Sequence, residues 1–482
     1  MKLSPSVPAC RGNNFMIDAR SGRRGRGGYA ESARRGARRC ETHSVGGQRL
    51  RRTLGPAVPI APGTRVDKFE LFFDLVFVVS FFIITRATAA NVTGRELLHA
   101  MLVLAVLWWC WVVHSVVASR VRLGEGFVPV AMVLGMVALF TFALALPQAF
   151  DDPHEGVAGP LLVAISYVAI RAVHLLLYLH AVQDKPHARR KMLQFVPEIV
   201  LTTALLLVAA MLPKHIEDPG TAVLVRDGLW IAVVIIQYGS GLTTGTWGWE
   251  LPSAEHWTER YDLILIIALG ESVISVGVGG NLIGQRVTWE AIPAAMLGIM
   301  FTAALWWAHF DFVGPAARIA LHAAEGGSRI ALARDAYAYL YLPMIAGVIL
   351  FAIGAEEVLR TITDPTGGVG ERPHGPAAPL LFGGVILYLA ADLAFQLRAL
   401  RNLPWTRIGV LVVLAAALPI GSHLPALATL ALLTAICVAL VAAEAIIFGS
   451  SRRALRAAVL EEKTAHEAAE AAWRARWRER ER

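Results

Sequence analysis

The sequence predicts an all-α polytopic membrane protein with about twelve transmembrane helices, arranged as two parallel six-helix repeats. Its 482 residues are 56% hydrophobic and only 17% charged, whereas soluble proteins are about 25% charged. The apolar residues fall in blocks of roughly 20, the number that a helix needs to cross about 30 Å of hydrocarbon. These blocks are apolar on every side, so we expect lipid rather than water around them.

The blocks follow one another along the chain in two sets, separated by a Gly- and Trp-rich connector at 239–256. The block at 405–420 is the shortest, and we expect Pro419 to end it. The first set is 70–90, 97–119, 127–149, 158–181, 192–212 and 221–242, and the second is 259–280, 289–313, 336–356, 379–400, 405–420 and 424–448.

Charged residues in the connections predict the orientation. Lysine and arginine gather in the tail and in alternate loops, and acidic residues in the opposite loops, so both termini are expected in the cytoplasm of a bacterium, with the spans in its inner membrane. The basic loops contain Arg120 and Arg122, Lys185 to Lys191, Arg318 to Arg334, and Arg398 and Arg401, and the acidic loops contain Asp151, Asp152, Glu155, Glu356, Glu357 and Asp364.

Four regions are expected. Residues 1–65 are basic and poor in hydrophobic residues, which predicts a disordered cytoplasmic tail. The two repeats occupy 66–245 and 256–449, and 450–482 predicts a charged cytoplasmic helix. The net charge is +8, but because the basic residues follow the topology we expect no specific nucleic acid partner.

Short signatures recur in the same order in both sets of blocks and predict an internal duplication. An even number of spans in each copy would make the copies face the same way, related by an axis along the membrane normal. The pairs are Phe73-Asp74-Leu75-Val76 with Tyr261-Asp262-Leu263-Ile264, Trp108-Trp109 with Trp306-Trp307, Met132 and Gly135 with Met344 and Gly347, and Tyr167 and Arg171 with Tyr388 and Asp392.

Glu70 and Asp74 are the first ionisable candidates. An ionisable group in hydrocarbon costs about 2.5 kcal/mol or more, so each needs a partner, a cavity or an interface. The two acids are four residues apart, on one face of the first predicted helix. They fit either a cation or proton site near the cytoplasmic mouth or two acids stabilised by the positive end of a helix. The sequence leaves both interpretations open.

Glu271 lies deeper, twelve residues after Glu259 and so about 18 Å into the membrane. Ser272 and Ser275 follow it, and small residues allow water or a close helix. Arg260, eleven residues earlier, faces the same direction after nearly three turns. We predict that Glu271 is a membrane-embedded acid on a proton or substrate path, with a structural ion pair as the alternative.

The fourth predicted helix of each repeat carries a charged residue. Arg171 stays charged and needs an acid, and its counterpart in the second repeat is Asp392. We expect these two to pair at the axis between the halves as a structural lock. His174 lies one turn after Arg171, and Glu198 follows Pro197, where a freed backbone carbonyl favours a polar pocket.

Motifs for catalysis, cofactors or metals are absent from the sequence. It has no HExxH, no P-loop, no dinucleotide glycine fingerprint and no GxSxG. The cysteines at 10, 40, 110 and 437 form no CxxC pair, so neither a disulfide framework nor a zinc site is predicted. His309 and Asp311, two residues apart, face different sides of a helix, which disfavours a metal site.

Two segments resemble a known family. The sequence ELFFDLVFV at 70–78 is similar to the opening signature of the bacterial low temperature requirement A (LtrA) family, and 259–272 is similar to its second signature. The resemblance covers roughly 65–449 and implies a bacterial membrane protein without a settled biochemical activity. Asp262 stands where the family pattern implies a small residue, so the resemblance gives it no shared role.

The preferred interpretation is a transporter- or channel-like protein that moves a cation, a proton or a small solute. Glu70, Asp74 and Glu271 are the predicted ion-interacting acids, and Arg260 and Arg171 are their charge partners. Alternatives are a membrane-embedded lipid-binding protein or enzyme, or a structural scaffold in a stress response. The expected partners are the bilayer and a small ion or solute, without a cofactor.

Overall fold

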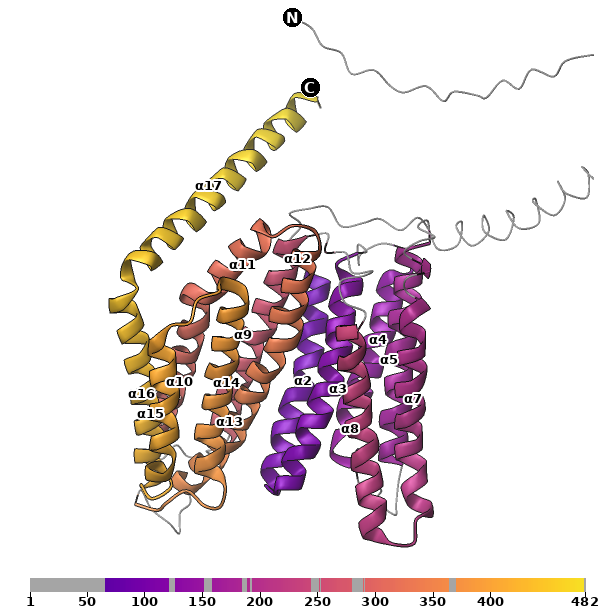
Figure 1. Cartoon of the computed structure of the whole chain (residues 1–482), viewed down its shortest axis with the longest axis vertical. Helices are drawn as coiled ribbons and strands as arrows, with labels where there is room; N and C mark the ends of the chain where they lie inside the picture. The colour runs from indigo at the N-terminus through magenta and orange to yellow at the C-terminus, as the bar shows by residue number, and fades with distance from the viewer. Residues whose placement is uncertain are drawn as a thin grey trace, which may run out of the picture. The chain divides into compact units, whose positions relative to one another are not determined.

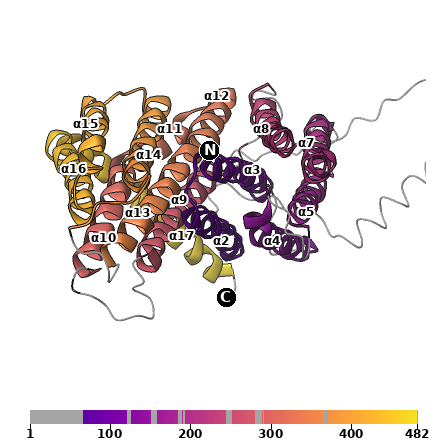
Figure 2. The same ribbon diagram turned by 90° about the horizontal axis from the view of Figure 1, so that it is seen from below.

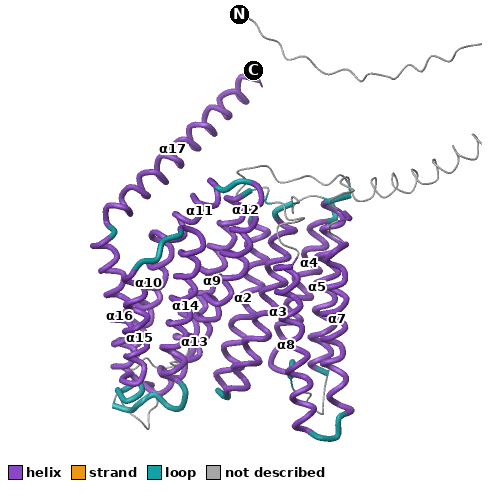
Figure 3. The backbone as a smooth tube through the Cα atoms, in the orientation of Figure 1, coloured by secondary structure: helices purple, strands orange, loops and turns teal. Residues whose placement is uncertain are grey.

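The computed structural model describes most of the chain after the basic tail; the predicted region 1–65 lies outside it. Within the described residues the chain is helical and has no strand (Figure 3). These residues are 66–120, 126–150, 158–183, 189–190, 193–243, 251, 253–279, 289, 291–363 and 370–480.

The helices of the first half are drawn indigo to magenta in Figure 1. Short 3₁₀ turns at Leu146–Gln148 and Leu212–His215 extend two of them, and another at Leu193–Phe195 precedes α7. The helices are α2 (Lys68–Ala90), α3 (Gly94–Ala118), α4 (Val128–Ala145), α5 (Gly159–Ala181), α7 (Val196–Met211) and α8 (Pro219–Thr243).

The second half contains longer continuous helical stretches. A π-helical segment, η4 (His309–Val313), joins α10 to α11, and a second, η5 (Ala333–Tyr339), joins α12 to α13. The helices are α9 (Ala254–Gly279), α10 (Ala291–Ala308), α11 (Gly314–Ala323), α12 (Gly326–Leu332), α13 (Leu340–Thr363), α14 (Ala377–Leu400), α15 (Trp405–Gly421), α16 (Ala426–Ile447) and α17 (Gly449–Arg480).

Local sequence explains where several helices begin. Asp67 caps α2 by accepting a hydrogen bond from the Phe69 backbone N–H, and Thr93 caps α3 by accepting one from the Glu96 N–H. Proline stands in the first turn of α4, α5 and α7, where no intrahelical N–H bond is lost. Arg401, with φ 54°, ends α14 in the left-handed conformation.

Ten of the described helical stretches are long and apolar enough to cross a membrane. A further helix, α15, is apolar but shorter, and it contains Pro419 before its end at Gly421. The predicted block 336–356 is longer than expected, since its helix continues to Thr363. Glu356 and Glu357, predicted in a loop, therefore lie within α13. The count of about twelve spans remains a prediction.

The helices of the two predicted repeats contact one another in a similar order. In the first half α2 contacts α3 and α4, α4 contacts α5, α5 contacts α7, α7 contacts α8, and α8 contacts α3. In the second half α9 contacts α10 and α13, α13 contacts α14, α14 contacts α15, α15 contacts α16, and α16 contacts α10. The close pairs α13–α14 and α15–α16 are visible from below in Figure 2. The helices α2 and α9 also contact each other and α13.

Glycines allow α13 and α14 to approach closely. A Cβ atom added at Gly347 would lie 2.6 Å from the Gly384 carbonyl oxygen, and one added at Gly384 would lie 2.4 Å from the Phe351 backbone nitrogen. Any larger residue would therefore push the two backbones apart. At Gly135, which the sequence matches with Gly347, the nearest atom is a Val173 side-chain carbon at 3.3 Å.

Candidate functional site

Buried carboxylates mark the candidate sites. Seven acidic side chains are buried in the described part of the chain, and six of them form ion pairs there. Since an unpaired charge in an apolar interior is unfavourable, the partners decide what each acid can do. The pairs are Glu70–His256, Asp74–Arg260, Glu198–Arg171, Glu356–Arg86, Asp392–Arg407 and Glu444–Arg407.

Glu70 and Asp74 both face α9. Glu70 Oε2 lies 2.7 Å from His256 Nε2, and Arg260 Nη2 donates to Asp74 Oδ1 at 2.8 Å. The Trp111 indole N–H donates to the same Asp74 oxygen at 2.8 Å, and the Arg260 guanidinium lies 5.4 Å from the Trp111 ring centre. The structure thus brings these predicted acids together with one predicted base.

The spacing of this cluster was readable in the sequence. The acids at 70 and 74 and the bases at 256 and 260 are each four residues apart, so each pair lies on one helix face and the two faces can match. Arg260 was predicted as a charge partner of the acids Glu70, Asp74 and Glu271, and the structure pairs it with Asp74. Sequence reasoning missed His256 and Trp111.

Glu271 is the exception among the buried acids. It is 2% exposed, its Oε1 accepts a hydrogen bond from Ser275 Oγ at 2.6 Å, and its Oε2 has no hydrogen-bond partner. Thr85 of α2 and Glu356 of α13 lie close to it. In the described part of the chain, no basic side chain forms an ion pair with this carboxylate.

The expected lock between Arg171 and Asp392 is wrong. Arg171 Nη2 donates to Glu198 Oε2 at 2.5 Å, so its partner lies on the next helix of its own half. Nearby, the Tyr167 hydroxyl contacts Thr202 Oγ1 at 2.9 Å and accepts from the Gln237 amide at 2.9 Å. The buried charge of Arg171 is therefore neutralised within the first half.

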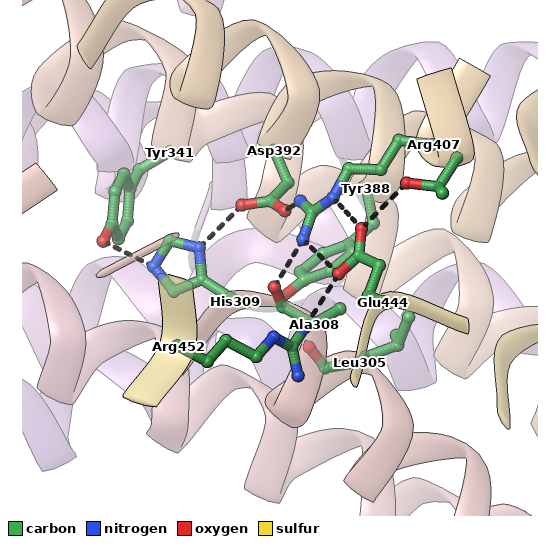
Figure 4. Close-up of polar contacts among 10 residues, drawn as sticks. Leu305, Ala308, His309, Tyr341, Tyr388, Asp392, Arg407, Glu444 and Arg452 are labelled. Carbon is green, nitrogen blue, oxygen red and sulfur yellow. Dashed lines mark hydrogen bonds and ion pairs between the residues drawn. The ribbon is translucent and has the colours of Figure 1, made fainter. Parts of the chain in front are cut away.

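Asp392 belongs to a network in the second half, drawn in Figure 4. Arg407 pairs with Asp392, donates from Nε to Glu444 at 2.8 Å, and donates from Nη2 to the Ala308 carbonyl at 2.7 Å. Glu444 also contacts Arg452 at 3.2 Å. All these charges are buried and partnered, which favours a structural role.

His309 connects this network to the region of Asp262. Its Nδ1 lies 2.7 Å from Asp392 Oδ1 and its Nε2 lies 3.2 Å from the Tyr341 hydroxyl (Figure 4). The Tyr341 hydroxyl in turn donates to Asp262 at 3.3 Å. Among the described residues no cluster of histidine, cysteine and acidic side chains could hold a metal ion.

Sequence reasoning missed Arg407 and Glu444, although the predicted duplication could have found them. Arg407 is the third residue of α15, as Glu198 is of α7. Glu444 is the nineteenth residue of α16, as Gln237 is of α8. A polar residue at one of these positions therefore pointed to a polar residue at the other.

Comparisons with known proteins identify the family of the chain. The chain matches the family model "Bacterial low temperature requirement A protein (LtrA)" over residues 65–442, which is most of its length. It is also 25% identical over 359 residues to the uncharacterized protein RA0937 of Rhizobium meliloti (strain 1021), a match that covers 72% of this chain and 80% of that protein. The chain therefore belongs to the bacterial low temperature requirement A family.

Proposed function

We propose that this protein is a membrane carrier of a proton or another small cation, and that Glu271 is the acid that takes up the ion. One observation carries the proposal: Glu271 is the buried carboxylate without a basic partner in the described part of the chain. The other buried acids there are held by arginine or histidine.

The physical argument concerns desolvation. An ionised carboxylate in an apolar interior loses its hydration, and Ser275 returns only one hydrogen bond to Glu271. The nearby acid Glu356 is itself paired with Arg86 and supplies no positive charge to Glu271. Binding a proton or a cation removes this penalty, and releasing it requires a route to water. An acid in this position is suited to exchange an ion.

The contact between α2 and α9 supplies a candidate route. Near the start of both helices lie the buried Asp74 and Arg260, and farther along α9 lie Glu271 and Ser275. Between these polar groups most buried residues are apolar, among them Phe77, Phe81, Ile264, Leu265 and Ala268, and Ser80 of α2 is a buried polar residue among them. Polar groups on both sides of an apolar barrier suit a carrier in a closed state.

We also infer that 66–245 and 256–449 are duplicated six-helix repeats of the same orientation. The equivalent helix contacts and the equivalent positions of Glu198 and Arg407 support this inference. The alternation of basic and acidic connections supports a bacterial inner-membrane location with both termini in the cytoplasm.

The test is ion flux in liposomes that contain the purified full-length protein. Wild type should dissipate a gradient of protons, potassium or sodium, and Glu271→Gln, which keeps the shape but not the charge, should reduce the rate at least about tenfold. Glu357→Gln is the matched control, since Glu357 is a partly exposed acid paired with Arg360. It should leave the rate unchanged.

Two outcomes would contradict the proposal. If liposomes with the wild-type protein move none of these ions faster than empty liposomes, the protein is not a carrier of them. If wild type and Glu271→Gln give equal rates, Glu271 does not take up the ion. Because a variant can fail to insert, each sample needs the same amount of monodisperse protein in the liposomes.

A further inference from the structure

A pocket opens between α3, α5 and α7 in the first half. About 670 Å³ of space not filled by protein atoms lies in it, counting the open solvent at its mouth. Its walls are apolar side chains, among them Val112, Val116, Leu175 and Ile199. Val116, Leu175 and Ile199 are half-buried, so apolar side chains reach the mouth of the pocket. The walls therefore suit an apolar body.

Five ionisable side chains also line the pocket. Arg120 and Tyr178 are half-buried, and Arg171, His174 and Glu198 are buried, at 2%, 5% and 7% exposure. The pairing of the three buried side chains is incomplete. Arg171 Nε and Nη1, Glu198 Oε1 and His174 Nδ1 are buried and have no hydrogen-bond partner. Buried polar atoms of this kind are uncommon in folded proteins and call for a partner.

We propose that this pocket binds a single-chain fatty acid, with its carboxyl group against Arg171 and Glu198 and its acyl chain along the apolar walls. The protonated carboxyl group has one acceptor and one donor. Its carbonyl oxygen accepts from an Arg171 N–H, and its hydroxyl donates to Glu198 Oε1, which satisfies unpartnered atoms of both residues. Arg171 and Glu198 neutralise each other, so an uncharged head group fits this pair of side chains.

The ion pairs of Arg407 in the second half leave no such unpartnered polar atoms. There the atoms of Asp392, Arg407 and Glu444 all have hydrogen-bond partners. The unsatisfied atoms of the first half are therefore not a necessary feature of this ion-pair position. The inference is independent of ion transport, since none of the pocket residues contacts Glu271.

The experiment is saturable binding of radiolabelled palmitic acid to the purified, delipidated full-length protein in detergent. Three unlabelled competitors probe the polar head: palmitic acid, methyl palmitate and hexadecane. Methyl palmitate keeps the acceptor but lacks the donor for Glu198, so it should compete at least about tenfold more weakly. Hexadecane, which has neither, should compete least.

Two substitutions test the location. Ile199→Trp fills the mouth without touching the polar atoms and should abolish saturable binding. Val208→Trp is its control, because Val208 lies on the same helix, is 40% exposed and does not line the pocket. It should bind as wild type does. Glu198→Gln should narrow the preference for palmitic acid over its methyl ester, because the amide removes the carboxylate acceptor.

The proposal is overturned if Ile199→Trp, folded and monodisperse, still binds palmitic acid as wild type does. It is also overturned if methyl palmitate and hexadecane compete as well as palmitic acid. Stronger competition by a palmitoyl-oleoyl phosphatidylethanolamine would make this a phospholipid site and would equally reject the fatty acid.

Discussion

The two halves of the molecule place an ion pair at the same contact and complete it differently. In the first half the pair is Arg171–Glu198, between α5 and α7, and it leaves nitrogen and oxygen atoms without partners. In the second half Arg407, on α15, contacts Asp392 and Glu444 and donates to a backbone carbonyl. The polar side-chain atoms of Arg407 and its two acidic partners thus all have hydrogen-bond partners, whereas several of Arg171 and Glu198 have none.

The largest expected effect is the loss of Arg407. Arg407→Met would leave Asp392 and Glu444 as buried acids without this cation, so we expect about 3–5 kcal/mol of lost stability. Denaturant or thermal unfolding in detergent measures this. The control is Arg398→Met, which removes a half-exposed arginine from its pair with Asp335 and should change stability by about 1 kcal/mol or less. Equal effects would show that the network is not structural.

The second effect compares two glycines. Gly347→Ala places a methyl group against the α14 backbone and should cost about 1–3 kcal/mol. Gly135→Ala meets only the Val173 side chain, and alanine is the better helix former, so stability should change by about 1 kcal/mol or less. Denaturant or thermal unfolding in detergent compares the stability of the two variants. A Gly135→Ala variant that is as unstable as Gly347→Ala would contradict this difference between the halves.

The third effect concerns the ion pair Arg171–Glu198. Replacing both members, as Arg171→Met with Glu198→Met, removes the charges together and should change stability by about 1 kcal/mol or less, because apolar groups can replace a buried ion pair. Arg171→Met alone should lower the free energy of unfolding by more, since it leaves the buried Glu198 carboxylate without a positive partner. A double variant that is less stable than the single variant would indicate that Arg171–Glu198 stabilises the fold as the Arg407 network does.

The smallest expected effect concerns an ion pair outside the two groups of residues around Arg171 and Arg407. Arg318 contacts Glu462 of α17 at 2.9 Å, and their side chains are 21% and 44% exposed. Because solvent screens such a pair, Arg318→Gln should change the unfolding free energy by less than about 1 kcal/mol. A larger loss would mean that exposed and buried ion pairs contribute alike in this protein.

The positions of the helices were predictable because they follow from the blocks of apolar residues in the sequence. Apolar blocks of about 20 residues have one stable form in lipid, and each predicted block coincides with a described helix. The extension of the block 289–313 through η4 into α11 was not predictable, because α11 is short and partly polar and a π turn has no clear sequence signal.

The partners of the charges were harder to predict. Sequence position gives the face of a helix but not the neighbour on which that face packs. Arg171 was assigned to Asp392 across the halves, whereas Glu198, on the next helix, lies within reach of the arginine side chain. Glu70 and Asp74 were correctly singled out, because acids in an apolar block require partners whichever helix supplies them.

The central claim is that Glu271 exchanges an ion with water. The most direct measurement is the charge displaced when protein-containing membranes on a solid support meet a jump in pH, potassium or sodium. Wild type and Glu357→Gln should give a transient current, and Glu271→Gln should give none. A current of the same size from Glu271→Gln would contradict the account.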